Sequence, residues 1–339
     1  MKIVLTFLLL IFSVLIVQTA AQTNETGKIT KKDKKSVSVP VIISDREGHY
    51  IPGLKKEDFT VYEDDVKQDV TFLATYDEPF NIALLLDTSG STEDVVKKIK
   101  SAAKDFIKLL NPKDKCLIAT FDNQVKILSA FTSDRETLRD SLDRIKSSKL
   151  GGTLMYNALE QITQNSFASV EGRKVVVLLT DGKDFGSAVT KDELLDRFEE
   201  SDVLIYSVFY KTGAIYDAAA TGKKGKRSKK SRRTKKVIIP PGPIFVPTEE
   251  EMAAREKSDE AEGIDALKKM SDTTAGRFYL SDAPGLGKTF KRIAGELREQ
   301  YRLGYRSKAA ADKAVSRDLI IKVARPDAVV RFREKVRAQ

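Results

Sequence analysis

The residues best suited to chemistry in this 339-residue chain lie in three short polar loops. The first reads Asp-Thr-Ser-Gly-Ser at 87–91, the second Gly-Gly-Thr at 151–153, and the third Thr-Asp-Gly at 180–182. Together they offer carboxylate and hydroxyl oxygens, which suit Mg²⁺, Mn²⁺ or Ca²⁺ better than zinc or copper. The predicted metal ligands are Asp87, Ser89, Ser91, Thr153 and Asp181.

The neutral hydroxyl ligands have a chemical consequence. They leave a divalent cation incompletely neutralised, so that it keeps affinity for a carboxylate from outside. The simpler alternative is that Asp87 and Asp181 only cap strand ends and that Thr153 caps a helix, because Asp, Ser and Thr are common at such turns. The presence of all three loops in one chain favours the metal site.

Buried strands must position these loops. Continuous apolar runs occur at 82–86, 116–121, 175–179 and 203–210, and such runs are typical of strands covered on both faces of a parallel sheet. Asp87 and Asp181 follow the first and third runs. Ligands of an open α/β sheet bind beyond the carboxyl ends of its strands, so the two carboxylates converge there if these strands are neighbours.

Helical apolar spacing separates the runs. It predicts helices at 93–110, 134–146, 153–163 and 191–200, and then at 263–274 and 286–300 with a strand at 277–280 between them. The alternation of strands and helices predicts an α/β fold with a doubly wound, mostly parallel sheet.

Both flanks of this α/β unit have a different pattern. Apolar and polar residues alternate near 37–43, 59–62 and 70–73, and again near 301–305, 319–323 and 329–332, which is typical of half-buried strands. Two or three strands are marginal in isolation, and domain termini often lie close together. We therefore expect the two flanks to form one small β-sandwich into which the α/β unit is inserted.

The three loops resemble the metal-ion-dependent adhesion site (MIDAS) of the von Willebrand factor type A (VWA) domain, over about residues 78–300. The resemblance implies that Ser89, Ser91 and Thr153 bind the metal directly. It implies that Asp87 and Asp181 bind through water or hold the serines, and that a partner's acidic residue completes the coordination. The flanking motifs, among them Gln-Tyr-x-Leu-Gly-Tyr at 300–305, resemble the secreted bacterial "VWFA-related" proteins of acidobacteria.

The N-terminus predicts export. Lys2, an apolar run of about 15 residues and Ala20-Ala21 predict a signal peptide cleaved after residue 21, with an uncleaved anchor as the alternative. The predicted location is secreted, periplasmic or cell-envelope, without a transmembrane helix after cleavage. The predicted parts are a signal peptide (1–21), a linker (22–36), an N-terminal β segment (37–77), a VWA domain (78–300) with an insertion at 211–258, and a C-terminal β segment (301–339).

The formal net charge of +10 comes from one segment. Ten basic residues and no acidic ones lie at 223–236, and without them the chain is nearly neutral. This local charge argues against sequence-specific nucleic-acid binding. The segment is either a solvated loop, paired with the acidic stretch at 249–262, or a contact for an anionic surface polymer.

Other kinds of chemistry have little support. One cysteine excludes an intrachain disulfide, and one histidine, His49, argues against a histidine-dependent triad. Gly-Leu-Gly-Lys-Thr at 285–289 resembles the end of a phosphate-binding loop, but Asp282 stands where that motif needs glycine. We therefore expect a non-enzymatic adhesion module that binds a partner's Asp or Glu through Mg²⁺, Mn²⁺ or Ca²⁺. The alternatives are a structural envelope protein with a fold-stabilising metal and a metal-dependent hydrolase.

Overall fold

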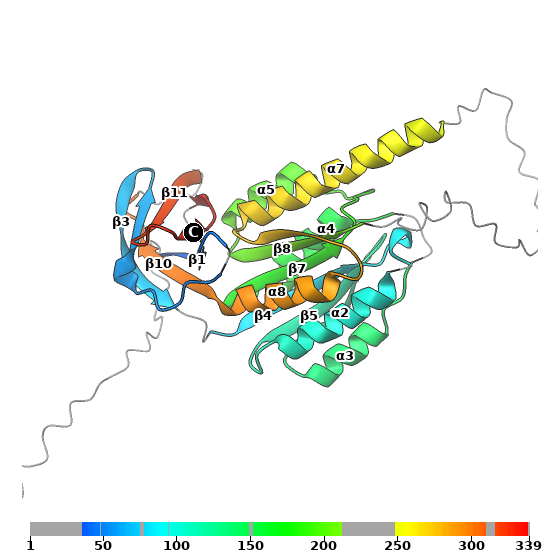
Figure 1. The fold of residues 1–339 in the computed structure, drawn as a ribbon, viewed down its shortest axis with the longest axis horizontal. Helices are drawn as coiled ribbons and strands as arrows, with labels where there is room; N and C mark the ends of the chain where they lie inside the picture. The colour runs from blue at the N-terminus through cyan, green and yellow to red at the C-terminus, as the bar shows by residue number, and fades with distance from the viewer. Residues whose placement is uncertain are drawn as a thin grey trace, which may run out of the picture. The chain divides into compact units, whose positions relative to one another are not determined.

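The computed structural model describes residues 36–47, 49–74, 78–93, 95–148, 152–211, 248–309 and 316–337. The predicted signal peptide, nearly all of the predicted linker and the basic run at 223–236 lie outside the described residues. The described chain forms two sheets, one of six strands and one of seven (Figure 1).

The six-stranded sheet has the order β6-β5-β4-β7-β8-β9. Its strands are β4 (Phe80–Asp87), β5 (Lys115–Phe121), β6 (Val125–Thr132), β7 (Arg173–Thr180), β8 (Val203–Tyr210) and β9 (Arg277–Ser281). All pairings are parallel except that of β6 with β5. The doubly wound sheet is thus confirmed. The antiparallel edge strand β6 was not predicted, because it is only partly buried and has no continuous apolar run.

Helices cover both faces of this sheet. Consecutive residues of β4 point to opposite faces, so Leu84 lies in one apolar core and Leu85 in the other. The first core includes α2 (Val96–Leu109), α3 (Arg135–Asp143) and α8 (Leu286–Arg298). The second includes α4 (Met155–Glu160) with the π-helix Gln161–Ser166, α5 (Lys191–Glu200) and α7 (Glu249–Thr273). Figure 1 shows the two groups on opposite sides of the sheet.

Helix α7 begins earlier than the helix predicted at 263–274. It begins at Glu249, where Thr248 accepts the Glu251 N–H at its hydroxyl group and donates its own N–H to the Glu251 carboxylate. This capping box starts the helix well before its first buried residue, Gly263. The apolar periodicity begins only there, so the sequence pattern predicts the helix from residue 263 and misses its polar first turns.

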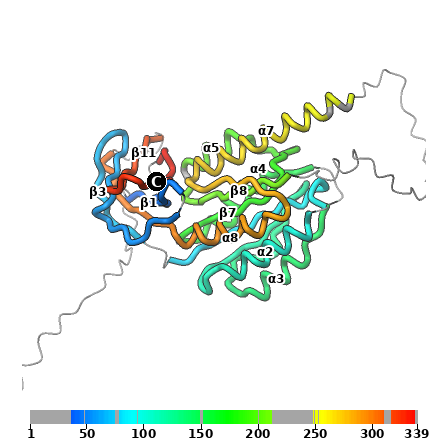
Figure 2. Tube along the Cα trace, in the orientation of Figure 1, coloured from blue at the N-terminus to red at the C-terminus, as the bar shows by residue number. Residues whose placement is uncertain are grey.

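The flanks form the second sheet, in the order β12-β1-β10-β3-β2-β11-β13. Its strands are β1 (Ser36–Ser44), β2 (Phe59–Glu63), β3 (Val66–Ala74), β10 (Gln300–Arg306), β11 (Ser316–Val323), β12 (Val329–Arg331) and β13 (Lys335–Arg337). Strands of the two flanks are interleaved: N-terminal β1 lies between C-terminal β12 and β10, and β10 pairs with N-terminal β3 (Figure 2).

This sheet is curled around its own apolar core, and the predicted two-sheet sandwich is not confirmed. The pairing of β10 with β3 changes register between Gly304 and Tyr305, and such a bulge bends a sheet. The Phe72 ring occupies the space where Gly304 would carry a side chain. One bent sheet therefore surrounds the core that the predicted sandwich would place between two sheets.

A buried ion pair joins the two flanks and gives a first prediction. Arg317 donates to the Glu63 carboxylate at 2.8 Å, and both side chains are almost fully buried. Replacement Arg317→Met leaves the carboxylate without this cation, so we expect a loss of about 3–5 kcal/mol in the free energy of unfolding, measured in urea. Adding Glu63→Leu should recover most of this loss, and simple additivity of the two losses would contradict a coupled pair.

Candidate metal site

The first loop leaves the carboxyl end of β4. Asp87 is fully buried, and its Oδ1 accepts the Ser89 N–H at 2.9 Å. The chain then makes a short 3₁₀ turn at Gly90–Thr92, in which the Ser89 and Ser91 hydroxyl oxygens lie 3.0 Å apart. Ser89 is buried and Ser91 is exposed. The loop thus directs two hydroxyl groups to one point that opens to solvent.

The third loop leaves β7, which is the neighbour of β4. Thr180 donates its hydroxyl proton to Asp87 Oδ2 at 2.7 Å and accepts the Gly182 N–H at 3.0 Å. Gly182 has φ +80°, which other residues rarely adopt. The next residue after Thr180 is the buried Asp181, so adjacent strand ends bring the two predicted carboxylates together.

The second loop is hydrogen-bonded to the segments that follow β7 and β5. Thr153 and Phe185 form an antiparallel bridge, in which Phe185 N–H donates to the Thr153 carbonyl at 2.8 Å. The Leu154 N–H donates to the carbonyl of Asp122, just after β5, at 2.8 Å. Residue 154, rather than Thr153, is the N-cap of α4, and it makes no side-chain cap bond. The alternative role of Thr153 as a helix cap is therefore wrong.

Electrostatics mark Asp87 as an unusual group of this edge. Burial, and next the negative charge of Asp181, raises the pKa of Asp87 to about 7. The bonds from Ser89 and Thr180 favour the ionised form but do not cancel this rise. A divalent cation would relieve the repulsion between two buried carboxylates, and the surrounding donors are all oxygens. The residues present therefore fit a hard divalent ion.

Two residues next to the predicted ligands were missed. Thr180 bridges Asp87 and the third loop, although the sequence analysis gave it no role. Lys183 places its ammonium group 4.0 Å from Asp181 Oδ2. Both residues lie close to Asp181 in the sequence, and this was the available signal. The contact of Thr180 with Asp87 could not be predicted, because it depends on β7 lying beside β4 in the sheet.

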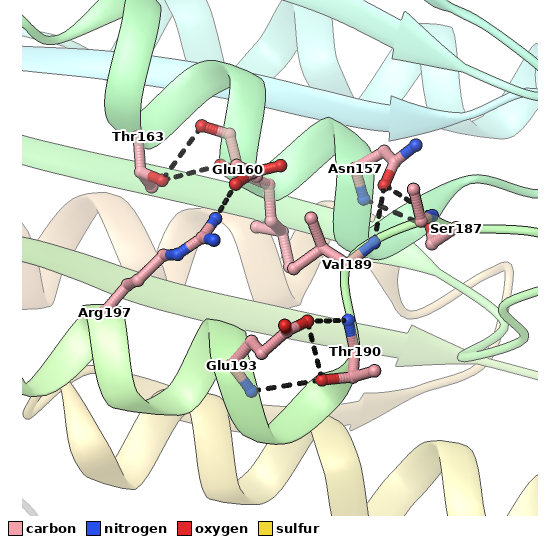
Figure 3. Close-up of polar contacts among 10 residues, drawn as sticks. Asn157, Glu160, Thr163, Ser187, Val189, Thr190, Glu193 and Arg197 are labelled. Carbon is pink, nitrogen blue, oxygen red and sulfur yellow. Dashed lines mark hydrogen bonds and ion pairs between the residues drawn. The ribbon is translucent and has the colours of Figure 1, made fainter.

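An outer layer fixes the loop that follows Asp181. Asn157 Oδ1 on α4 accepts the N–H groups of Ala188 and Val189 at 3.0 and 3.2 Å, and Thr190 and Glu193 form the capping box of α5 (Figure 3). Arg197 forms an ion pair with Glu160 between α5 and α4. The segment that follows the third loop is thus held by α4 and α5.

Comparison with known proteins relates part of this chain to a known family. Residues 81–233 match the family model of the von Willebrand factor type A domain, and the six-stranded part has the VWA fold. Domains of this class commonly hold a divalent metal at a MIDAS and often bind proteins through it. No curated protein matches the sequence.

Similar solved structures are distant. Proximal thread matrix protein 1 from the mussel byssus is 16% identical with a TM-score of 0.48, over 70% of this chain and 51% of its own. The chain thus spans about half the length of that protein, another structure of which is described with a zinc-occupied MIDAS motif (18% identity, TM-score 0.47, 68% and 48% covered). The conserved hypothetical protein BatB from Bacteroides thetaiotaomicron is 18% identical with a TM-score of 0.43, over 64% and 97%.

The raised pKa of Asp87 predicts a pH dependence in the absence of metal. The folded state keeps a proton that the unfolded state releases above the ordinary value of 3.8, so stability falls as the pH rises from about 4 to 7. In EDTA, we expect the Tm of Asp87→Asn to rise relative to the unsubstituted protein by a few degrees between pH 5 and about 7.5. A Tm difference that is constant with pH would contradict this origin.

Thr180 gives a third prediction. In Thr180→Val, Asp87 Oδ2 loses a donor and the Gly182 N–H loses its acceptor, which should weaken Mg²⁺ binding about ten- to a hundredfold in calorimetric titration. Thr180→Ser keeps the hydroxyl group and is the matched control. A folded valine variant with unchanged affinity would show that the bridge does not support the site.

Proposed function

We propose that this chain is an exported, non-enzymatic binding protein whose VWA domain captures an acidic side chain of a partner protein through a divalent cation. In this proposal Ser89, Ser91 and Thr153 ligate the ion directly. Asp87 and Asp181 ligate it through water or hold the serines in place. Mg²⁺ is the expected ion, with Mn²⁺ and Ca²⁺ as close substitutes.

One observation carries the proposal. Two buried carboxylates from adjacent strands meet beside hydroxyl groups 3.0 Å apart, at the open carboxyl edge of the sheet. A bound divalent cation supplies a coordination position for an external carboxylate. The protein's part is to orient the hydroxyl groups, through the Ser89 N–H on Asp87, and to hold Asp87, through Thr180. Loop residues around the ion would determine which acidic partner fits.

Export and attachment belong to the same proposal. The predicted signal peptide supports a secreted or envelope location, and the flanking motifs support kinship with bacterial VWFA-related proteins. No helix among the described residues is long and apolar enough to cross a bilayer. The basic run at 223–236 is a candidate contact for an anionic surface polymer.

Two rival functions predict different behaviour. A metal that only stabilises the fold predicts lost structure after chelation. A hydrolase predicts turnover and a general base near the ion. The single histidine, His49, lies in the turn after β1, which belongs to the seven-stranded sheet and not to the sheet that carries the predicted metal ligands. Its Nδ1 lies 3.1 Å from Asp45 Oδ2. We therefore favour binding over catalysis.

Removal of one carboxylate tests the proposal. We expect Asp87→Ala to weaken Mg²⁺ binding at least about a hundredfold in calorimetric titration, with an unchanged circular dichroism spectrum. Asp114→Asn is the matched control, because Asp114 is also buried but precedes β5, at the opposite end of the sheet. Equal affinity of Asp87→Ala and the unsubstituted protein would refute the metal site.

Chelation separates the rivals. Proteins captured by the immobilised chain from an envelope extract should be lost in EDTA and regained with Mg²⁺, while circular dichroism stays native. Loss of the native spectrum in EDTA would favour a structural metal instead.

A further inference from the structure

Lys183 has a position that the metal site alone does not explain. It directly follows the third loop, two residues after Asp181, with its ammonium nitrogen 4.0 Å from Asp181 Oδ2. Its backbone N–H faces the other carboxylate oxygen, Oδ1, at 3.4 Å. The carboxylate is 2% exposed, whereas the lysine side chain is 26% exposed. The ammonium group thus reaches a buried anion from the solvent side.

The neighbouring carboxylate, Asp184, has other partners. Asp184 lies next in the chain, but its Oδ1 accepts the Tyr156 N–H at 3.0 Å and the Ser187 hydroxyl group at 2.6 Å. Its Oδ2 accepts the Ser187 N–H at 3.3 Å. Asp184 is therefore used to hold α4 and the following loop, which leaves the lysine directed to the predicted metal ligand.

The need for a cation at this point follows from the burial of two carboxylates. Asp87 and Asp181 end adjacent strands, are at most 3% exposed, and come close enough to interact electrostatically. A buried anion is stable only when it is paired or hydrogen-bonded. A positive group on the same loop meets part of that need when no metal is bound.

We propose that Lys183 is a tethered counter-ion that competes with the divalent cation for Asp181 and so sets the metal affinity of the site. This inference rests on the proposed function, because it assumes that the ion binds between the three loops. The metal ion and the ammonium group are both positive and both bind the Asp181 carboxylate. Because they repel each other, each weakens the binding of the other to this carboxylate. The lysine thus stabilises the metal-free loop and opposes the metal-loaded one.

The closing experiment uses the full chain with three substitutions. Lys183→Gln removes the charge, and Lys183→Arg keeps it. Lys126→Gln is the matched control, since Lys126 also pairs with a buried carboxylate at this edge, Asp122 at 3.1 Å, which is not a predicted ligand. Each protein is titrated with Mg²⁺ and with Mn²⁺ by calorimetry, and its Tm is measured in EDTA and in excess Mg²⁺.

We expect Lys183→Gln to bind Mg²⁺ about three- to tenfold more tightly, whereas Lys183→Arg and Lys126→Gln stay near the unsubstituted protein. In EDTA, the Tm of Lys183→Gln should fall by about 2 °C, and excess Mg²⁺ should abolish or reverse this difference. A lysine with a merely structural role would lower the Tm in both conditions and would not tighten metal binding.

Two results would overturn the competition while leaving the metal site intact. One is equal Mg²⁺ affinity of Lys183→Gln and the unsubstituted protein. The other is tighter binding by Lys183→Arg to the same extent as Lys183→Gln, because the charge would then not be the cause. Absence of binding by the unsubstituted protein would instead overturn the metal site itself, and the competition with it.

Discussion

The repulsion between two buried carboxylates is the constraint on which the site depends. Asp87 and Asp181 end neighbouring strands and have almost no contact with solvent. Negative charges in such surroundings are costly unless hydrogen bonds or cations compensate them. The nearby groups supply that compensation: the Ser89 N–H and the Thr180 hydroxyl bind Asp87, and the Lys183 ammonium group faces Asp181. Their placement explains why this edge of the sheet suits a divalent cation.

The two ends of the six-stranded sheet have different surroundings. At the carboxyl ends of β4 and β7 lie the loops that carry the predicted ligands Asp87 and Asp181. At the amino ends, Arg173 of β7 stacks over the Phe80 ring of β4 at 3.7 Å and reaches the Gln300 side chain, at the start of β10, at 3.2 Å. Gln300 in turn donates to the Tyr206 hydroxyl group of β8 at 2.7 Å. The curled sheet therefore joins the α/β part at the end of the sheet opposite the loops that carry Asp87 and Asp181.

The sequence predicted what depends on local pattern. The continuous apolar runs identified the buried strands, and the spacing of Asp87, Ser89 and Ser91 identified the first loop. It did not predict what depends on neighbours in space. The edge strand β6 lacks a continuous run, the curl of the second sheet depends on the register change at Gly304, and the role of Thr180 exists only because β7 lies beside β4.

Helix α7 shows how a long element can support the site through one short contact. Gly263 lies against the backbone of Gly182, and a side-chain carbon on Gly263 would lie only 2.6 Å from the Gly182 carbonyl oxygen. Glycine at both positions thus permits the close approach, and the positive φ of Gly182 turns the chain away just after Asp181. The turns of α7 before Gly263 are mostly exposed and polar. The support of the third loop therefore begins at Gly263, and the polar start of the helix can differ without moving Asp181.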